Sequence, residues 1–244
     1  MTTTSDGTPA PARIDLNADL GEGVTDDAGL LAVVTSANVA CGFHAGDLEV
    51  MRAVCDAAAG RGVVVGAQVS YLDREAFGRR PMDVAEGVLL AWVAEQVGTL
   101  REVARAAGTD VAYVKPHGAL YHRVVDDPVQ AAAVLDGSDD LPVLGLPGSV
   151  LLSLAAQRGR LDVPEGFPDR AYTPEGRLVS RDEPGAVVAD RGTVATNAVA
   201  LAAGGAVRTV CVHGDSPGAV ATAYAVRAAL VGAGIAVIPW IEQR

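Results

Sequence analysis

The fold class is decided by the apolar run at residues 63–68, which reads Val-Val-Val-Gly-Ala-Gln. Its valines follow one another without polar alternation, a pattern typical of a strand that is buried on both faces. Strands of that kind belong to parallel sheets, whose connections run through helices. A helical pattern precedes the run at Leu48–Ala59, and a longer one follows at Val84–Ala107. The segment therefore predicts one unit of a repeated strand–helix pattern.

The same pattern recurs along the chain. Further strands are predicted at Arg13–Asn17, Val33–Val39, Val111–Lys115, Leu141–Leu146, Ala186–Val188, Val207–Val212 and Ile235–Pro239. Further helices are predicted at Pro128–Leu135, Ser149–Gln157, Val194–Ala203 and Ala219–Val231. The more polar stretch Glu165–Arg191 predicts a long loop or hairpin over one face. Repeated strand–helix units indicate an α/β protein, either a barrel or a doubly wound sheet.

Length and composition favour one domain with a sizeable core. The chain has 244 residues, of which 50% are hydrophobic and 20% charged, so it suits one domain or two small ones. Residues 1–12 are rich in Thr, Ser, Pro and Gly and predict a disordered tail. No linker or repeat interrupts the remainder, which predicts a single domain over residues 13–244.

Charge and cysteine content exclude several functional classes. The net charge of −11 would repel nucleic-acid phosphates, so no nucleic-acid partner is expected. No apolar run reaches the roughly 20 residues needed to cross a bilayer. Cys41, Cys55 and Cys211 form no CxxC pair, which argues against a disulfide framework or a cysteine-built zinc site. We expect a reduced, cytoplasmic protein without a membrane partner, and a homo-oligomer stays open.

The unusual polar residues follow the predicted strands. In α/β folds, chemistry collects at the carboxyl ends of the strands. All four histidines, His44, His117, His122 and His213, lie in such turns. His122 could equally be a surface residue, and Asp19 and Glu22 could simply cap a helix. The other three histidines, together with Asp19, favour a site.

One basic residue differs from the rest. Lys115 is the single lysine among 19 basic residues, and it directly precedes Pro116-His117-Gly118. Lysine is a compact point charge that can lose its proton when buried, whereas arginine is a planar fork. Since arginine replaces lysine everywhere else in the chain, Lys115 is a strong candidate for the site.

Several familiar catalytic signatures are missing from the sequence. It contains no GxxxxGK[ST] phosphate loop, no GxSxG nucleophile elbow and no HExxH zinc helix. Asp215 with Ser216-Pro217 instead predicts a helix start, with proline at its first position. Free N–H groups at such a start would suit an anion.

Six motifs, read in order, resemble the LamB/YcsF family, whose members are A subunits of prokaryotic 5-oxoprolinases. The motifs are Asp15–Gly23, Ser36–Asp47, Phe77–Arg80, Lys115–Tyr121, Asp169–Tyr172 and His213–Pro217. The match runs from Ile14 to about Pro239. The resemblance implies a distorted (β/α) barrel of the TIM-like kind, similar to the polysaccharide-deacetylase and glycoside-hydrolase barrels.

The resemblance also implies an activity. It is the ATP-dependent opening of 5-oxo-L-proline to L-glutamate, together with partner subunits B and C and with ATP as co-substrate. Such a site needs cations for phosphate, a base for water and a carboxylate that orients the base. The candidate catalytic residues are Asp19, Glu22, His44, Lys115 and His117. The candidate substrate- or phosphate-binding residues are Asn17, Asn38, Gln68, Arg79, Arg80, Arg170, His213 and Asp215.

One position departs from the family pattern. The family usually has Gly-Ala-His-Pro-Ser-Tyr-Pro-Asp after the third strand, whereas residues 66–73 here read Gly-Ala-Gln-Val-Ser-Tyr-Leu-Asp. The amide of Gln68 cannot act as a base and is a poor metal ligand, although it donates and accepts hydrogen bonds.

Two alternatives stay open at this point. One is a metal-dependent amide hydrolase or deacetylase that works without ATP and holds a divalent ion on Asp19, His44 and His117. The other is a non-catalytic scaffold subunit, in which Gln68 marks lost chemistry.

Overall fold

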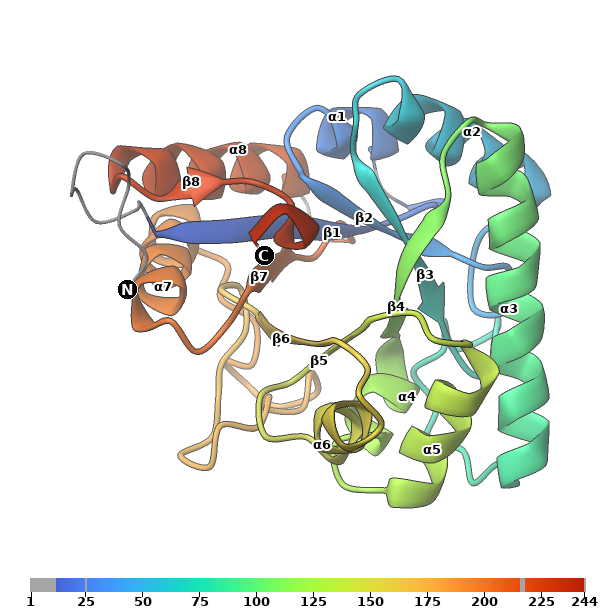
Figure 1. Ribbon diagram of the computed structural model, residues 1–244. Helices are drawn as coiled ribbons and strands as arrows, with labels where there is room; N and C mark the ends of the chain where they lie inside the picture. The colour runs from blue at the N-terminus through green and yellow to red at the C-terminus, as the bar shows by residue number, and fades with distance from the viewer. Residues whose placement is uncertain (1–11, 25, 216–217, 244) are drawn as a thin grey trace.

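Seven parallel strands close into a barrel (Figure 1). The computed structural model describes residues 12–24, 26–215 and 218–243, so the predicted tail lies outside the described residues except for residue 12. The strands run in the order β2-β3-β4-β5-β6-β7-β1, and β1 pairs back with β2. Their bounds are β1 Arg13–Leu20, β2 Ser36–Ala40, β3 Val64–Val69, β4 Val111–Pro116, β5 Val143–Gly145, β6 Asp162–Gly166 and β7 Thr209–Val212. The barrel, rather than the doubly wound sheet, is confirmed.

The barrel is distorted at its eighth strand. β8, Ala236–Val237, pairs only with the start of β1, at Arg13 and Ile14. Further along, β1 pairs with β7 through residues 15–18 and with β2 through residues 17–20. The eight-residue β1 therefore has three partners, its residues 17 and 18 pair with β7 and β2 at once, and the barrel closes without β8.

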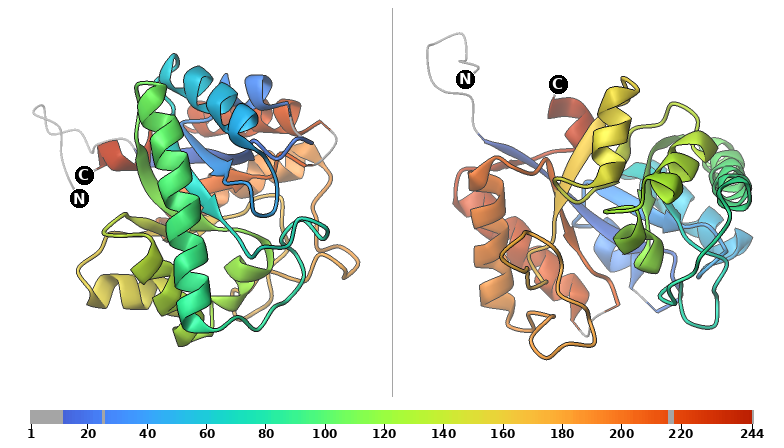
Figure 2. Two further views of the ribbon diagram at one scale, coloured as in Figure 1. Left: turned by 90° about the vertical axis from the view of Figure 1, so that its right-hand side faces the viewer. Right: turned by 90° about the horizontal axis from the view of Figure 1, so that it is seen from below.

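Helices cover the outside of the barrel (Figures 1 and 2). Their bounds are α1 Asp27–Leu31, α2 Leu48–Ala59, α3 Glu86–Ala106, α4 Gly118–Arg123, α5 Pro128–Gly137, α6 Val150–Gln157, α7 Arg191–Gly204 and α8 Ala219–Gly232, followed by the 3₁₀ turn η1 at Trp240–Gln243. Side chains cap several N-termini, as where Asp47 accepts from the backbone N–H groups of Glu49 and Val50. In the part of the chain that the structure describes, no helix is long and apolar enough to cross a membrane.

Two sequence-based predictions are wrong in the sixth unit. The strand lies at Asp162–Gly166, where no strand was predicted and where the last two residues fall in the expected loop, while the predicted strand at Ala186–Val188 is only a bridge between Val187 and Arg170. The real strand reads Asp-Val-Pro-Glu-Gly and lacks an apolar run, because its Glu165 is buried among polar side chains of other strands. The segment from residue 167 to 190, here called the 167–190 loop, folds beside the carboxyl ends of the strands, as predicted for this polar stretch.

The interior of the barrel is polar. Along β1, Ile14, Leu16, Ala18 and Leu20 join the hydrophobic core, and the alternate residues Asp15, Asn17 and Asp19 are buried and hydrogen-bonded to side chains of other strands. The period of two in a strand directs these two sets to opposite faces. Asn17 reaches Glu165 of β6, which is not a neighbour of β1 in the sheet, at 2.9 Å. The polar set therefore occupies the centre of the barrel, beside an apolar cluster that includes Tyr113, Val163 and Trp240.

A glycine makes room for one large side chain in this interior. A Cβ at Gly66 would lie 2.2 Å from the Tyr113 ring, so only glycine fits there. The register between β3 and β4 also shifts at this point. The Tyr113 hydroxyl donates to Asn38 Oδ1 at 2.6 Å, which ties β4 to β2 through the interior.

Asp15 makes the stability of the barrel depend on pH. Burial raises the pKa of Asp15 to about 6, although hydroxyls of Ser36, Thr209 and Thr35 donate to it. The folded state then binds more protons than the unfolded state between about pH 4 and 6, so stability falls as pH rises through that window.

We predict that the free energy of unfolding of the wild type, relative to Asp15→Asn, falls by up to about 3 kcal/mol between about pH 4 and 6. Urea unfolding at several pH values measures this difference. Parallel pH profiles for the two proteins would contradict the assignment.

Candidate functional site

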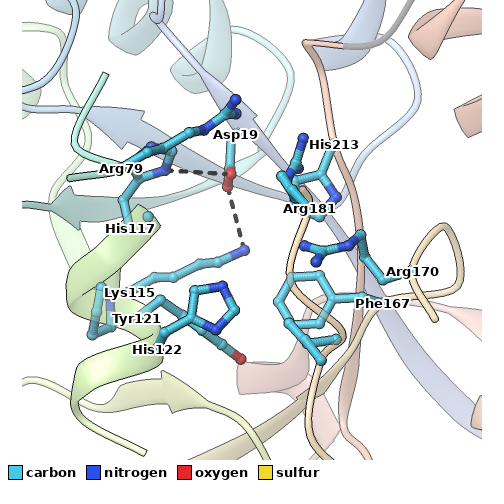
Figure 3. Close-up of a pocket in the computed structure, with 13 residues that line it drawn as sticks. Asp19, Arg79, Lys115, His117, Tyr121, His122, Phe167, Arg170, Arg181 and His213 are labelled. Carbon is cyan, nitrogen blue, oxygen red and sulfur yellow. Dashed lines mark ion pairs between the residues drawn. The ribbon is translucent and has the colours of Figure 1, made fainter. Parts of the chain in front are cut away.

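A small pocket lies at the carboxyl ends of the strands. Its volume is about 50 Å³, and Figure 3 shows its two walls. Asp19 from β1, Lys115 from β4 and His117 directly after β4 form one wall, and Phe167, Arg170, Arg181 and His213 face them. The prediction that post-strand residues converge is confirmed, because parallel strands end at the same rim.

The ammonium of Lys115, which lines this pocket, has four close partners. Its Nζ lies 2.8 Å from Glu165 Oε1, 3.3 Å from Asp19 Oδ1, 3.3 Å from Asn17 Oδ1 and 3.1 Å from Cys211 Sγ. The side chains of Lys115, Asp19 and Glu165 are each less than a tenth exposed. One buried cation therefore lies between two buried carboxylates, which favours a role in positioning Asp19 over contact with a phosphate.

This arrangement fixes the charge of both partners. Burial alone would lower the pKa of Lys115, but Asp19 and, after Cys211, Glu165 raise it well above its usual value. Burial alone would raise the pKa of Asp19, but Lys115 and His117 hold it well below its usual range. Asp19 is thus ionised and Lys115 protonated. A buried lysine can lose its proton, but the carboxylates around Lys115 keep the proton on its ammonium.

Beside Asp19, three side chains converge on Glu22. Glu22 Oε1 lies 3.6 Å from His117 Nδ1 and 3.7 Å from His44 Nε2, and it accepts a hydrogen bond from Gln68 Nε2 at 2.9 Å. Glu22, His44 and His117 could together hold a metal ion, since one donor atom of each lies within 4.8 Å of the others. The sequence suggested Asp19 in place of Glu22. Asp19 instead belongs with Lys115 and Asn38.

His44 is buried without a hydrogen-bond partner. It is 1% exposed, and neither ring nitrogen makes a hydrogen bond. Its ring stacks on His117 with centroids 4.1 Å apart. Burial and the neighbouring His117 lower the pKa of His44 to about 4, so the ring is neutral at pH 7. A neutral, unpartnered imidazole suits a ligand role better than a proton carrier.

A strained turn holds the two imidazoles. Phe77 has a positive φ of 57°, which is rare for a bulky residue. Its ring packs edge-on against both His44 and His117, and its carbonyl accepts from His117 Nε2 at 3.2 Å. At the next position, a Cβ on Gly78 would lie 2.3 Å from Ser70 Oγ. The Phe-Gly-Arg motif therefore fixes the orientation of the imidazoles.

The opposite wall carries a second histidine–carboxylate pair. Asp169 Oδ2 lies 2.9 Å from His213 Nδ1 and accepts from the His213 backbone N–H at 3.0 Å. The His213 ring also stacks on Phe167, with centroids 5.4 Å apart. Burial alone would raise the pKa of Asp169, but His213 lowers it, so the carboxylate is ionised. His213 lines the pocket, and with Nδ1 committed to Asp169, Nε2 is the nitrogen available there.

Arginines surround the mouth of the pocket. Arg79 and Arg181 both pair with Asp215, which thereby joins the loop after β3 to the 167–190 loop. Both arginines also line a neighbouring cavity of about 520 Å³ that extends from the pocket along α4. His122 has a lowered pKa because of burial, Arg170 and Arg181. The mouth is therefore electropositive in a protein of net charge −11, which suits an anionic ligand.

Other predicted residues occupy different places. Asn17 and Asn38 lie within the barrel, where Asn38 Nδ2 donates to Asn17 Oδ1 at 2.7 Å. Arg170 lines the pocket, but two of its nitrogens donate to backbone carbonyls of the 167–190 loop. Arg80 pairs with Asp73 and Glu75 and does not line the pocket. Helix α8 begins at Ala219 after Gly218, in agreement with the predicted helix at Ala219–Val231, and the predicted anion site at Ser216-Pro217 lies outside the described residues.

Sequence reasoning missed several members of the site, namely Tyr113, Glu165, Cys211, Asp169 as partner of His213, Arg181, and His122 as part of the wall. Asp169 lies in the motif Asp169–Tyr172, so its pairing with a histidine could have been predicted from the sequence. Glu165 was hidden by an atypical strand, and Arg181 is one arginine among many in a polar loop. Neither carried a signal in the sequence that separates it from its neighbours.

Comparisons with known proteins agree with this geometry. The LamB/YcsF family model matches residues 14–244. A Streptomyces coelicolor protein named as the A subunit of 5-oxoprolinase is 57% identical, and the match covers 92% of this chain and 98% of that protein. The lactam utilization protein from Thermus thermophilus superposes with a TM-score of 0.87 at 36% identity, covering 93% of this chain and 99% of that one.

A more distant structure shares the fold alone. The catalytic domain of a peptidoglycan N-acetylglucosamine deacetylase from Eubacterium rectale superposes with a TM-score of 0.53 at 13% identity, covering 98% of this chain and 92% of that one. The predicted similarity to deacetylase barrels is therefore confirmed at the level of the fold.

The Lys115 contacts lead to a stability prediction. Lys115→Met leaves Asp19 and Glu165 buried without their cation, which we expect to cost roughly 3–5 kcal/mol of unfolding free energy. Adding Glu165→Gln should recover part of the loss, and a double-mutant cycle by chemical denaturation measures the coupling. The matched control is Arg101→Met, which removes an ion pair with the exposed Asp139 and should cost at most about 1 kcal/mol. An equal loss in the two single variants would refute the role of Lys115.

Proposed function

The chain belongs to the LamB/YcsF family, and we propose that it is the A subunit of an ATP-dependent 5-oxoprolinase. The assembly opens 5-oxo-L-proline to L-glutamate, with ATP as co-substrate and subunits B and C as partners. Relatives named as A subunits of 5-oxoprolinase and a lactam utilization protein support this substrate class.

The observation that carries the proposal is the pair of facing polar walls. Asp19, kept ionised by Lys115, lies on one side of the pocket, and His213, oriented by Asp169, lies on the other. Hydrolysis of a cyclic amide needs an acceptor for the proton of water and a donor for the leaving nitrogen. Two such groups on opposite sides of a small pocket meet that need.

The chemistry follows from the weakness of a lactam as an electrophile. Transfer of the γ-phosphoryl group of ATP to the ring carbonyl oxygen gives a phosphorylated imidate and ADP. Asp19 orients a water and accepts its proton as the oxygen attacks the carbonyl carbon. The ring nitrogen keeps the hydrogen of the lactam N–H, and His213 in its protonated form gives it a second proton as the carbon–nitrogen bond breaks. The new hydroxyl group on the carbon releases its proton to solvent, which leaves γ-glutamyl phosphate. A second water hydrolyses that acyl phosphate to glutamate and phosphate.

The arginines of the mouth bind the anionic part of the substrate. Arg79 and Arg181 share the Asp215 carboxylate. A carboxylate or phosphoryl group can take over contacts with their guanidinium forks, which match the geometry of such groups. A second candidate is a metal-dependent amide hydrolase that needs no ATP, which is favoured by the trio Glu22, His44 and His117 because it could hold an ion.

Substitutions on the two walls test the proposed roles. Asp19→Asn and His213→Gln should each lower kcat for ATP-dependent glutamate release by roughly 10²–10⁴-fold, measured on variants shown by circular dichroism to be folded, since Asp19→Asn also removes a charge partner of Lys115. The assay uses the complex with subunits B and C. Arg80→Ala is the matched control, since Arg80 is exposed and outside the pocket, and it should keep near-normal turnover. Wild-type rates in both wall variants would exclude these roles.

A separate prediction concerns the mouth. Arg181→Ala should raise KM for 5-oxoproline about tenfold while kcat changes little, because a contact made equally in the ground and transition states affects binding alone. Arg177→Ala is the control from the same loop, as Arg177 pairs with Asp126 away from the pocket. Steady-state kinetics of the reconstituted complex separates the two variants, and an unchanged KM for Arg181→Ala would argue against an anion site there.

A further inference from the structure

We propose that Glu22, His44 and His117 form a binding site for a divalent transition-metal ion of the zinc type, and that Gln68 completes it by turning its amide. The inference rests on contacts beneath the pocket and does not depend on which amide the protein hydrolyses. It assigns to Gln68 a role other than that of a lost histidine.

The separations fit a metal ion. In a tetrahedral site with metal–ligand bonds near 2.1 Å, two ligand atoms lie about 3.4 Å apart. Glu22 Oε1 is 3.6 Å from His117 Nδ1 and 3.7 Å from His44 Nε2. Two imidazoles with one carboxylate are a donor set that favours zinc-type ions over Mg²⁺.

The histidines are prepared for this role. His117 Nε2 lies 3.2 Å from the Phe77 carbonyl, to which it can donate only as N–H, so Nδ1 is the nitrogen that faces Glu22 and Gln68. A backbone acceptor on the far nitrogen is the usual outer partner of a metal-binding histidine. His44 is buried with both nitrogens unpartnered. A buried polar group without a partner is costly, and a metal ion at Nε2 would satisfy it.

Gln68 fills the gap between the ligands. Its Nε2 lies 2.9 Å from Glu22 Oε1 and 2.8 Å from His117 Nδ1. Its two N–H groups therefore lie between these two atoms, where a bound cation would lie. Its Oε1 is buried and has no hydrogen-bond partner. A half-turn of the amide exchanges the two atoms and brings this oxygen toward the same centre. An amide oxygen is a weaker ligand than imidazole, but it is an established ligand of cations.

The site lies against the proposed reaction centre. His117 lines the pocket and its Nδ1 is 3.8 Å from Asp19 Oδ2. A bound ion supplies Lewis-acid activation of water there. Asp19, held by Lys115, keeps its place as the residue that orients that water.

Zinc binding tests the proposal directly. The full-length protein is stripped with a chelator and titrated with Zn²⁺ against a competing chromophoric chelator, and its Tm is recorded with and without the ion. We expect about one ion per chain and a higher Tm. Gln68→Ala should weaken affinity at least about tenfold, the smallest effect typical of losing an outer partner. Gln68→Glu, which offers an oxygen in either orientation, should restore or exceed wild-type affinity.

Two further variants separate ligation from folding. His44→Leu removes both unpartnered nitrogens, so the metal-free protein should keep its Tm or gain stability while the Zn²⁺-dependent rise disappears. His122→Ala removes a histidine outside the trio and should leave Zn²⁺ affinity unchanged. The site would be overturned if the wild type bound Zn²⁺ no more tightly than His44→Leu does. The role of Gln68 would be overturned if Gln68→Ala bound Zn²⁺ as tightly as the wild type. Both outcomes are independent of 5-oxoproline turnover.

Discussion

The structure depends on the neutralisation of one buried cation, the ammonium of Lys115, inside the barrel. A lysine removed from water is costly unless opposite charges surround it, and here Asp19 and Glu165 lie within 3.3 Å. The contact joins β4 to β1 and β6, which are not neighbours of β4 in the sheet. The same contact that permits a polar interior also keeps Asp19 ionised at the rim, so stability and the proposed chemistry rest on one group.

The remaining polar residues extend this arrangement in layers. Below Lys115, Asp15 accepts from hydroxyls of Ser36, Thr35 and Thr209. At the same depth as the lysine, Asn38 and Lys115 both donate hydrogen bonds to Asn17, which links β2 and β4 to β1. Above it lie Glu22, Gln68 and the stacked imidazoles. The atoms left without partners on His44 and Gln68 belong to this upper layer beside the pocket, and buried polar groups without partners often mark a functional site.

Much of this could be predicted from the sequence, and the rest fails for physical reasons. Parallel strands end at one rim, so residues following them converge, and His117, His213 and Asp19 did so. The motifs specified the family and hence the barrel. Glu165 escaped notice because β6 carries a proline and a carboxylate where an apolar run was expected. Lys115 was recognised as unusual, but its partners Asp19 and Glu165 come from strands distant in the sequence, so its buried ion pairs could not be predicted. The trio that could hold a metal ion contains Glu22 and not the expected Asp19, because Asp19 is ion-paired with Lys115.

We propose that this chain contributes the hydrolytic site of an ATP-dependent 5-oxoprolinase assembly. The most direct test of this proposal is glutamate and ADP release from 5-oxo-L-proline by this chain together with purified subunits B and C, with each of the three omitted in turn. We predict that glutamate forms only with ATP and all three subunits, and that omission of this chain abolishes its release. Full glutamate formation by B and C alone, or by this chain without ATP, would contradict the claim.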